Sequence, residues 1–213
     1  MSTSKPGTIL RYPTNMRIEH WIVALAFLLA AASGLAMFYP ALFWLSDLFG
    51  GGALTRAVHP WVGLIMAVAF FLLAPKVAGH AKWEKVDGEW LKHGSQVLSG
   101  HEEDVPPVGQ YNAGHKLVFY LMVTCLTLLL LTGLVIWRAY FTAYFPIGVT
   151  RVSALLHAFF AFVLICGIIV HVYASFWVKG AMQSMTRGRV TYGWAWKHHR
   201  LWFRDETGAS PRK

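Results

Sequence analysis

Long apolar runs alternate with polar segments along this chain. Four runs come close to the roughly 20 residues that a helix needs to cross a bilayer, although the second is short. These runs cover residues 20–39, 59–75, 114–137 and 152–178. A polar loop over residues 76–113 follows the second run, and a polar tail over residues 179–213 follows the fourth. The pattern predicts an all-α integral membrane protein, with residues 1–213 forming a single domain built on a four-helix bundle.

The composition agrees with a membrane protein. Hydrophobic residues make up 56% of the 213 residues and charged residues only 14%, which is outside the usual range of a soluble domain. The first apolar run is full length and no small-residue cleavage motif is evident, so we expect no cleaved signal peptide. Cys125 and Cys166 lie inside apolar runs, and we expect them to be core residues, not a disulfide or a metal site.

The basic residues predict the orientation. Of the 19 Lys and Arg residues, 16 lie in the two tails and in the 76–113 loop with its edges, against Arg56, Arg138 and Arg151 on the other side. Cytoplasmic segments of membrane proteins are enriched in Lys and Arg, so both termini are expected in the cytoplasm. The net charge of +9 is then largely a topology signal, and no nucleic-acid partner is expected.

Two histidines lie in the fourth apolar run. His157 and His171 are fourteen residues apart. On a helix they point the same way, because fourteen steps turn about 1400°, and they are separated by about 21 Å along the axis. Ionisable side chains inside a span are rare, and two on one face at two depths suggest one ligand for each of two stacked metal centres. His20 supplies a partner at the inner depth and His59 one at the outer depth.

We therefore expect two haem b groups, each with two histidine ligands and no open site, which favours electron transfer. His20 and His171 would hold the inner iron, and His59 and His157 the outer iron. The alternative is four interfacial histidines hydrogen-bonded within the bundle, but it leaves the matched depths unexplained. The histidines of the polar segments are expected to be solvated: His80, His93, His101, His198 and His199.

Three further residues are candidate haem neighbours. Gly34 is fourteen residues after His20, so it shares that helix face at the outer depth and would make room for the outer porphyrin. Helix–helix packing is the alternative for this glycine and equally for Gly63, Gly133 and Gly167. Arg17 and Arg56 each stand three residues before a ligand histidine, where they could pair with propionates. For Arg17 the alternative is anchoring on the cytoplasmic side.

The 76–113 loop ends in the motif GQYNAGHK, residues 109–116. Gln110 and Asn112 offer amide groups, and Gly109 and Gly114 permit close backbone approach. At the depth of His171, this segment suits a quinone carbonyl, although a turn before a helix explains it equally well. Three acidic residues in the loop could feed protons to such a site or simply be solvated: Glu102, Glu103 and Asp104.

The two outer connections, residues 40–58 and 138–150, are rich in aromatic residues and glycine and poor in charge. Such surface often marks a partner interface, and an aromatic belt dipping into lipid is the alternative.

Several motifs occur together and in order between Arg11 and Phe203: RIEHW, HP at His59, YNAGHK, TGLVIWR, LLH at His157, HVYASFWVKG and AWKHH. Together they resemble the membrane cytochrome b (gamma) subunit of respiratory formate dehydrogenase, a four-helix dihaem protein of the bacterial inner membrane.

The resemblance implies an electron donor, an acceptor and a set of site residues. The donor would be a periplasmic iron–sulfur (beta) subunit, fed by a molybdenum or tungsten formate dehydrogenase alpha subunit. The acceptor would be menaquinone or ubiquinone, reduced on the cytoplasmic side. The family's haem ligands fall on the four histidines above. Its quinone contacts fall on Asn112, Gly114 and His171, with Gly109 or Gln110 nearby, and His115 stands where some relatives have glutamine.

Three rival functions remain. The cytochrome b subunit of a nickel–iron hydrogenase or a related quinone-linked reductase would use the same chemistry with another donor. A transporter of metal ions or protons predicts carboxylates inside the spans, and the span interiors contain no Asp or Glu. A passive membrane anchor would leave the four histidines unexplained.

Overall fold

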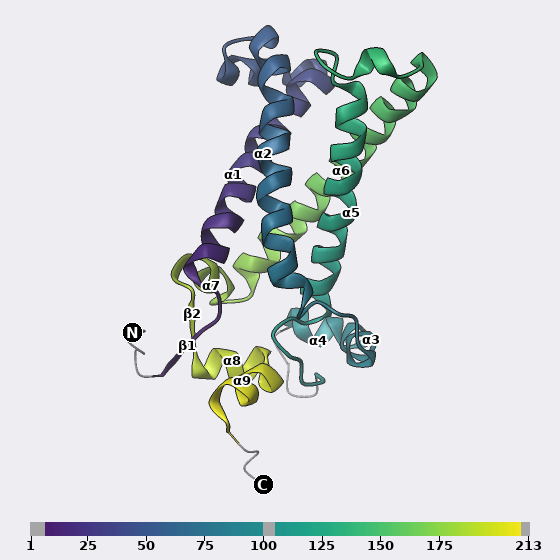
Figure 1. The fold of residues 1–213 in the computed structure, drawn as a ribbon. Helices are drawn as coiled ribbons and strands as arrows, with labels where there is room; N and C mark the ends of the chain where they lie inside the picture. The colour runs from purple at the N-terminus through teal and green to yellow at the C-terminus, as the bar shows by residue number, and fades with distance from the viewer. Residues whose placement is uncertain (1–6, 100–104, 210–213) are drawn as a thin grey trace. The chain divides into compact units, whose positions relative to one another are not determined.

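The computed structural model describes residues 7–99 and 105–209. Four helices are long and apolar enough to cross a membrane: α1 (Thr14–Phe38), α2 (Gly52–Ala78), α5 (Ala113–Ile136) and α6 (Ile147–Trp177) (Figure 1). Each contains most of one apolar run, and α2 begins seven residues before the run that the sequence suggested. His59 therefore lies inside its helix, with nearly two turns of α2 before it.

The chain divides into two compact units. Ile18–Ala74 and Leu121–His171 form the membrane unit, and Met1–Arg17, Pro75–Tyr120 and Val172–Lys213 form the polar unit. The four candidate haem-ligand histidines all belong to the membrane unit. The motif GQYNAGHK belongs to the polar unit, whereas His101, Glu102, Glu103 and Asp104 lie outside the residues that the structure describes.

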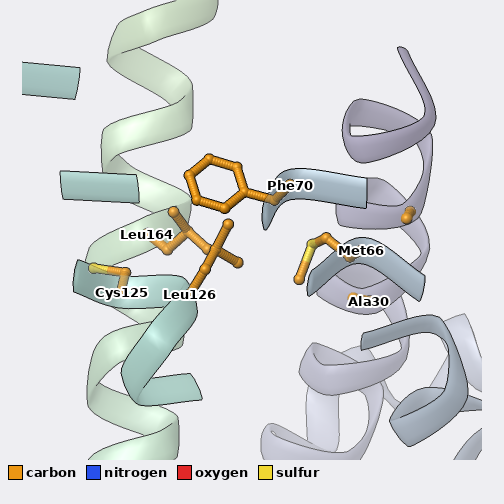
Figure 2. Close-up of a cluster of buried hydrophobic side chains, with 7 residues drawn as sticks. Ala30, Met66, Phe70, Cys125, Leu126 and Leu164 are labelled. Atoms are coloured by element: carbon orange, nitrogen blue, oxygen red, sulfur yellow. The ribbon is translucent and has the colours of Figure 1, made fainter. Parts of the chain in front are cut away.

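The core of the membrane unit draws on all four long helices. Its buried residues are Ala26 and Ala30 of α1, Met66 and Phe70 of α2, Cys125 and Leu126 of α5, and Leu164 of α6 (Figure 2). Only 11–28% of the residues in each apolar stretch are buried, and the exposed remainder includes many Leu, Ile and Phe side chains. That surface is suited to lipid. Cys125 is a core residue as expected, but the expectation was wrong for Cys166 of α6, which is exposed.

Two 3-10 helices occur in the connections over residues 40–58 and 138–150: η1 (Pro40–Phe49) and η2 (Thr142–Tyr144). The segment η1 ends at Gly50 and Gly51, whose φ angles of 83° and 99° lie in the left-handed region that favours glycine. The N–H of Gly50 donates to the carbonyl of Asp47, which closes the turn that leads into α2.

Among the described residues, the polar unit contains five short helices and a small two-stranded sheet, and the all-α expectation did not include the sheet. The helices are α3 (Lys85–Lys92), α4 (Gly94–Ser99), α7 (Ala181–Arg187), α8 (Tyr192–His198) and α9 (Arg200–Thr207). Strands β1 (Thr8–Leu10) and β2 (Arg189–Thr191) pair antiparallel, with Ile9 opposite Val190. This pairing joins the two terminal tails of the chain.

A buried ion pair fixes the start of α5 to α3. The Nζ of Lys116 donates to Oδ2 of Asp87 over 2.8 Å, and the backbone N–H of Glu84 donates to the same oxygen over 2.7 Å. The sequence analysis counted Lys116 among the basic residues that indicate the orientation. In the structure it is a buried member of an ion pair, with only 4% of its surface exposed.

Candidate functional site

The four histidines of the membrane unit lie in two pairs. The ring centroids of His20 on α1 and His171 on α6 are 6.4 Å apart. Those of His59 on α2 and His157 on α6 are 6.3 Å apart. The structure thus brings together the same partners that depth along the helices suggested, and α6 supplies one member of each pair.

The separation within each pair suits a shared metal ion. Two metal–nitrogen bonds of about 2.0–2.1 Å, added to the radii of the two rings, put imidazole centroids roughly 6–6.5 Å apart. Among the described residues, no group of three or more His, Cys, Asp or Glu side chains gathers to form a larger metal site. Each pair of imidazoles would be able to hold the iron of a haem, which would supply one-electron redox chemistry there.

A hydroxyl contacts each imidazole of the His59–His157 pair, which is called the outer pair after the orientation expected from the sequence, with His20–His171 as the inner pair. The Nδ1 of His59 is 2.8 Å from Oγ of Ser33 on α1, and the Nδ1 of His157 is 3.0 Å from Oγ1 of Thr132 on α5. Both hydroxyls also donate to a carbonyl one turn back in their own helix, that of Leu29 over 2.7 Å for Ser33 and that of Leu128 over 2.6 Å for Thr132.

A glycine beside each hydroxyl leaves space for the ring. A Cβ added to Gly34 would lie 3.3 Å from Cε1 of His59, and one added to Gly133 would lie 3.2 Å from Cε1 of His157. Gly34 therefore lies at the outer pair, as its spacing from His20 indicated. The atom it accommodates here is an imidazole carbon, whereas its contact with a porphyrin stays a prediction.

Sequence reasoning missed the two hydroxyl residues. Ser33 and Thr132 are polar positions inside apolar helices, and each immediately precedes a glycine. That dipeptide was a usable signal, because a hydroxyl in a span can either bond back to its own helix or hold a neighbouring group.

The inner pair has a different surrounding. The Nδ1 of His20 is buried and has no hydrogen-bond partner among the described residues, and the ring of Trp21 contacts that of His20 edge-on.

The two arginines that are candidate partners of haem propionates differ in their surroundings. Arg17 donates from Nη1 to the carbonyl of Thr186 over 2.5 Å, whereas the side chain of Arg56 is exposed one turn before His59.

The predicted quinone segment caps α5. The Oδ1 of Asn112 accepts from the backbone N–H of His115 over 3.1 Å and from Nδ1 of the same residue over 2.7 Å. A backbone N–H can only donate, so this contact identifies Oδ1 and leaves the Nδ2 amide of Asn112 without a hydrogen-bond partner among the described residues. A Cβ on Gly114 would lie 3.4 Å from Oδ1 of Asn112, an ordinary contact distance.

Residues from both tails hold the preceding loop. The Nη2 of Arg11 donates to the carbonyl of Gln110 over 2.8 Å and lies 3.1 Å from Nε2 of His199. The Nδ1 of His199 donates to the carbonyl of Gly109 over 2.9 Å. The guanidinium of Arg11 also lies 5.0 Å and 5.1 Å from the ring centroids of Trp194 and Trp202.

The expectation that His199 is solvated was wrong. Its surface is 1% exposed, because it is enclosed by Arg11, Trp194 and the 109–110 backbone. Burial, and then the charges of Arg11 and His115, lower the pKa of His199 well below its usual range. Of the other polar-segment histidines, His80 is exposed, and His93 and His198 are half-buried.

Comparison with known proteins confirms the resemblance seen in the motifs. Residues 11–188 match the family model described as prokaryotic cytochrome b561, a family that implies haem b. The chain is 41% identical over 203 residues to the cytochrome b556 subunit of formate dehydrogenase from Haemophilus influenzae, covering 95% of this chain and 85% of the relative. It is 40% identical over 210 residues to the cytochrome b556(Fdn) subunit of the nitrate-inducible formate dehydrogenase of Escherichia coli K12, and the match covers 99% of this chain and 97% of that relative.

The family match and the four apolar helices together show that this chain is a multi-pass membrane protein. The chain therefore belongs to the prokaryotic cytochrome b561 family, together with the cytochrome b556 subunits of formate dehydrogenase.

Proposed function

We propose that this chain is the dihaem cytochrome b subunit of a membrane-bound formate dehydrogenase and carries electrons through the bilayer to a quinone. The observation that carries the proposal is the presence of two histidine pairs, each with ring centroids 6.3–6.4 Å apart, in one membrane unit. The relatives named as formate dehydrogenase cytochrome b556 subunits supply the class of enzyme.

In this proposal His20 and His171 hold the inner haem, and His59 and His157 hold the outer haem. A haem held by these histidines would supply one-electron redox chemistry. The protein's part is to hold the four imidazoles in place and to exclude water from them. Helix α6 sets the distance between the two centres, because His157 and His171 lie about 21 Å apart by helix rise.

The electron donor in this proposal is an iron–sulfur beta subunit on the periplasmic side, linked to a molybdenum or tungsten formate dehydrogenase alpha subunit. The outer connections provide apolar surface for such a partner, including Phe43, Trp44 and Leu48 of η1 and Tyr144 of η2, which are 55–81% exposed. The relatives favour this donor over a hydrogenase, since their names specify formate dehydrogenase.

The electron acceptor in this proposal is menaquinone or ubiquinone, bound at Gly109, Gln110, Asn112 and Gly114 with the inner ligand His171. The Nδ2 of Asn112 offers an uncommitted donor for a quinone carbonyl. We place this site, the 76–113 loop and both termini on the cytoplasmic side of the bacterial inner membrane, following the distribution of Lys and Arg. Arg17 and Arg56 are the proposed partners of haem propionates.

This arrangement would make turnover electrogenic. Two electrons would enter from outside and two protons from inside for each quinone reduced. At 100 mV, one charge moved across the membrane corresponds to about 2.3 kcal/mol, so two would store roughly 4.6 kcal/mol. Glu102, Glu103 and Asp104 could feed protons to the site, and solvated loop residues are the alternative for them.

Haem content in single histidine variants tests the proposal. The complex purified with each of His20→Ala, His59→Ala, His157→Ala and His171→Ala should contain one haem b per chain in place of two. The His59 and His157 variants should lose the same haem, identified by its potential, and the other two variants the other haem. His80→Ala, an exposed histidine, is the matched control and should keep both haems. Loss of one and the same haem in the His20 and His59 variants would refute the pairing.

A further inference from the structure

Each histidine of the outer pair contacts the same kind of two-residue element, a hydroxyl residue followed by a glycine. Ser33–Gly34 on α1 receives the ring of His59, and Thr132–Gly133 on α5 receives the ring of His157. In both cases the hydroxyl meets Nδ1 while the glycine leaves room for Cε1. The two elements come from different helices and different parts of the sequence, so their agreement points to a shared requirement of the imidazoles.

The hydrogen bonds fix which nitrogen carries the proton. A serine or threonine hydroxyl has a single proton to donate. Carbonyl oxygens can only accept, so the short contacts of Ser33 with the carbonyl of Leu29 and of Thr132 with that of Leu128 are hydrogen bonds only if the hydroxyl protons point to these carbonyls or to the next ones along, those of Ala30 and Leu129. Each hydroxyl oxygen can therefore only accept from the histidine, so both imidazoles carry their proton on Nδ1. Their Nε2 lone pairs are left for a metal ion.

We propose that Ser33 and Thr132 are positioning residues that set the tautomer and the donor strength of the outer histidine ligands. This inference rests on the proposed function, because it assumes that His59 and His157 ligate the outer haem. A hydrogen bond accepted from the far nitrogen of a ligating imidazole orients the ring and raises its basicity. A more basic ligand favours the oxidised iron, which carries the higher positive charge.

In the inner pair, His20 has no such hydroxyl contact, because its buried Nδ1 has no hydrogen-bond partner among the described residues. The outer haem should therefore be the one whose redox potential responds to loss of a hydroxyl. Ser33 and Thr132 would tune the first of the two centres to receive electrons.

Redox titration of Ser33→Ala and Thr132→Val in the purified complex tests the inference. Each variant should keep two low-spin haems per chain. At a fixed potential, the ratio of reduced to oxidised outer haem should rise about threefold to tenfold, the upper value corresponding to about 59 mV for one electron. The potential of the inner haem should stay unchanged. The outer haem is the titration wave that His59→Ala removes.

Two further variants separate tuning from general damage. Thr132→Ser keeps a hydroxyl and should restore the wild-type potential. Thr127→Val is the matched control, because Thr127 also donates to a carbonyl one turn back on α5, that of Val123 over 2.7 Å, and has no hydrogen bond to a histidine among the described residues. It should leave both potentials unchanged.

The outcomes distinguish this inference from the proposed function. Two haems with unaltered potentials in both Ser33→Ala and Thr132→Val would overturn the inference alone. An equal shift in Thr127→Val would overturn it too, because the effect would then be one of helix packing. A wild-type complex without a haem that depends on His59 and His157 would overturn the proposed function.

Discussion

Two histidines, the half-buried His59 of the membrane unit and the buried His199 of the polar unit, use their ring nitrogens differently. Both donate from Nδ1, His59 to the hydroxyl of Ser33 and His199 to the carbonyl of Gly109. The Nε2 of His199 accepts from the guanidinium of Arg11. The ring of His59, in contrast, lies beside that of His157, and no hydrogen bond uses its Nε2 among the described residues.

The difference separates a structural histidine from a ligand. An imidazole whose two nitrogens are both satisfied by the protein holds a loop in place and has nothing left for chemistry. Two facing imidazoles, each with its Nδ1 already hydrogen-bonded, present two lone pairs, one on each ring. A cation can bind between them. Asn112 likewise has one polar atom in use and one available, because its Oδ1 caps α5 while its Nδ2 has no hydrogen-bond partner among the described residues.

The largest expected effect comes from filling the space beside an outer imidazole. Gly133→Leu should eliminate the outer haem, because even a Cβ at this position would lie 3.2 Å from Cε1 of His157. The polar unit and the inner haem should be retained, as judged by haem content and by the spectrum of the remaining haem. Gly63→Leu is the control, since a Cβ there meets nothing within 4 Å. Retention of both haems in Gly133→Leu would show that the ring needs no such space.

The second expected effect concerns the uncommitted amide. Asn112→Asp keeps an oxygen that can cap α5 but replaces the Nδ2 donor, so quinone reduction should slow about tenfold, the cost of roughly 1.4 kcal/mol from one lost hydrogen bond. Both haems should stay bound and reducible by formate. Asn112→Ala should slow the reaction similarly and also destabilise the start of α5 by about 1 kcal/mol. A wild-type rate in Asn112→Asp would exclude Nδ2 as a substrate donor.

The third prediction concerns His199, whose two ring nitrogens are both hydrogen-bonded within the protein. His199→Ala removes one contact of the buried Arg11, which still donates to the carbonyl of Gln110, and removes the hydrogen bond to the carbonyl of Gly109, so the polar unit should lose about 1–3 kcal/mol of stability. Hydrogen exchange should quicken in residues 108–111 and 199–203, while the complex keeps two haems. Loss of a haem in this variant would contradict the distinction between structural and ligating histidines.

The smallest effect is a pH dependence of the polar unit. The pKa of His199 is lowered by burial and by Arg11, so the unfolded chain binds a proton at a higher pH than the folded one. The free energy of unfolding should therefore fall as the pH drops below about 6.5, by at most about 1.4 kcal/mol per pH unit from this residue. Hydrogen exchange between pH 7 and pH 5, corrected for the intrinsic rates, should show the effect. His199→Gln should weaken it, and identical profiles for the two proteins would contradict the assignment.

The sequence by itself determined the features that depend on spacing along one helix. Run length predicted four apolar helices, and the fourteen-residue interval between His157 and His171 put them on one face at two depths. Gly34 was found in the same way, from its interval to His20. These inferences succeed because helix geometry is local and nearly constant.

Only the tertiary structure decided which atoms of those residues meet others. The hydroxyls of Ser33 and Thr132 could have bonded to their own helices alone, and nothing in the sequence shows that they also reach His59 and His157. His199 appeared to be solvated, because its burial depends on Arg11, 188 residues away. Contacts between distant segments depend on how the helices and tails pack, which no single apolar run or motif encodes.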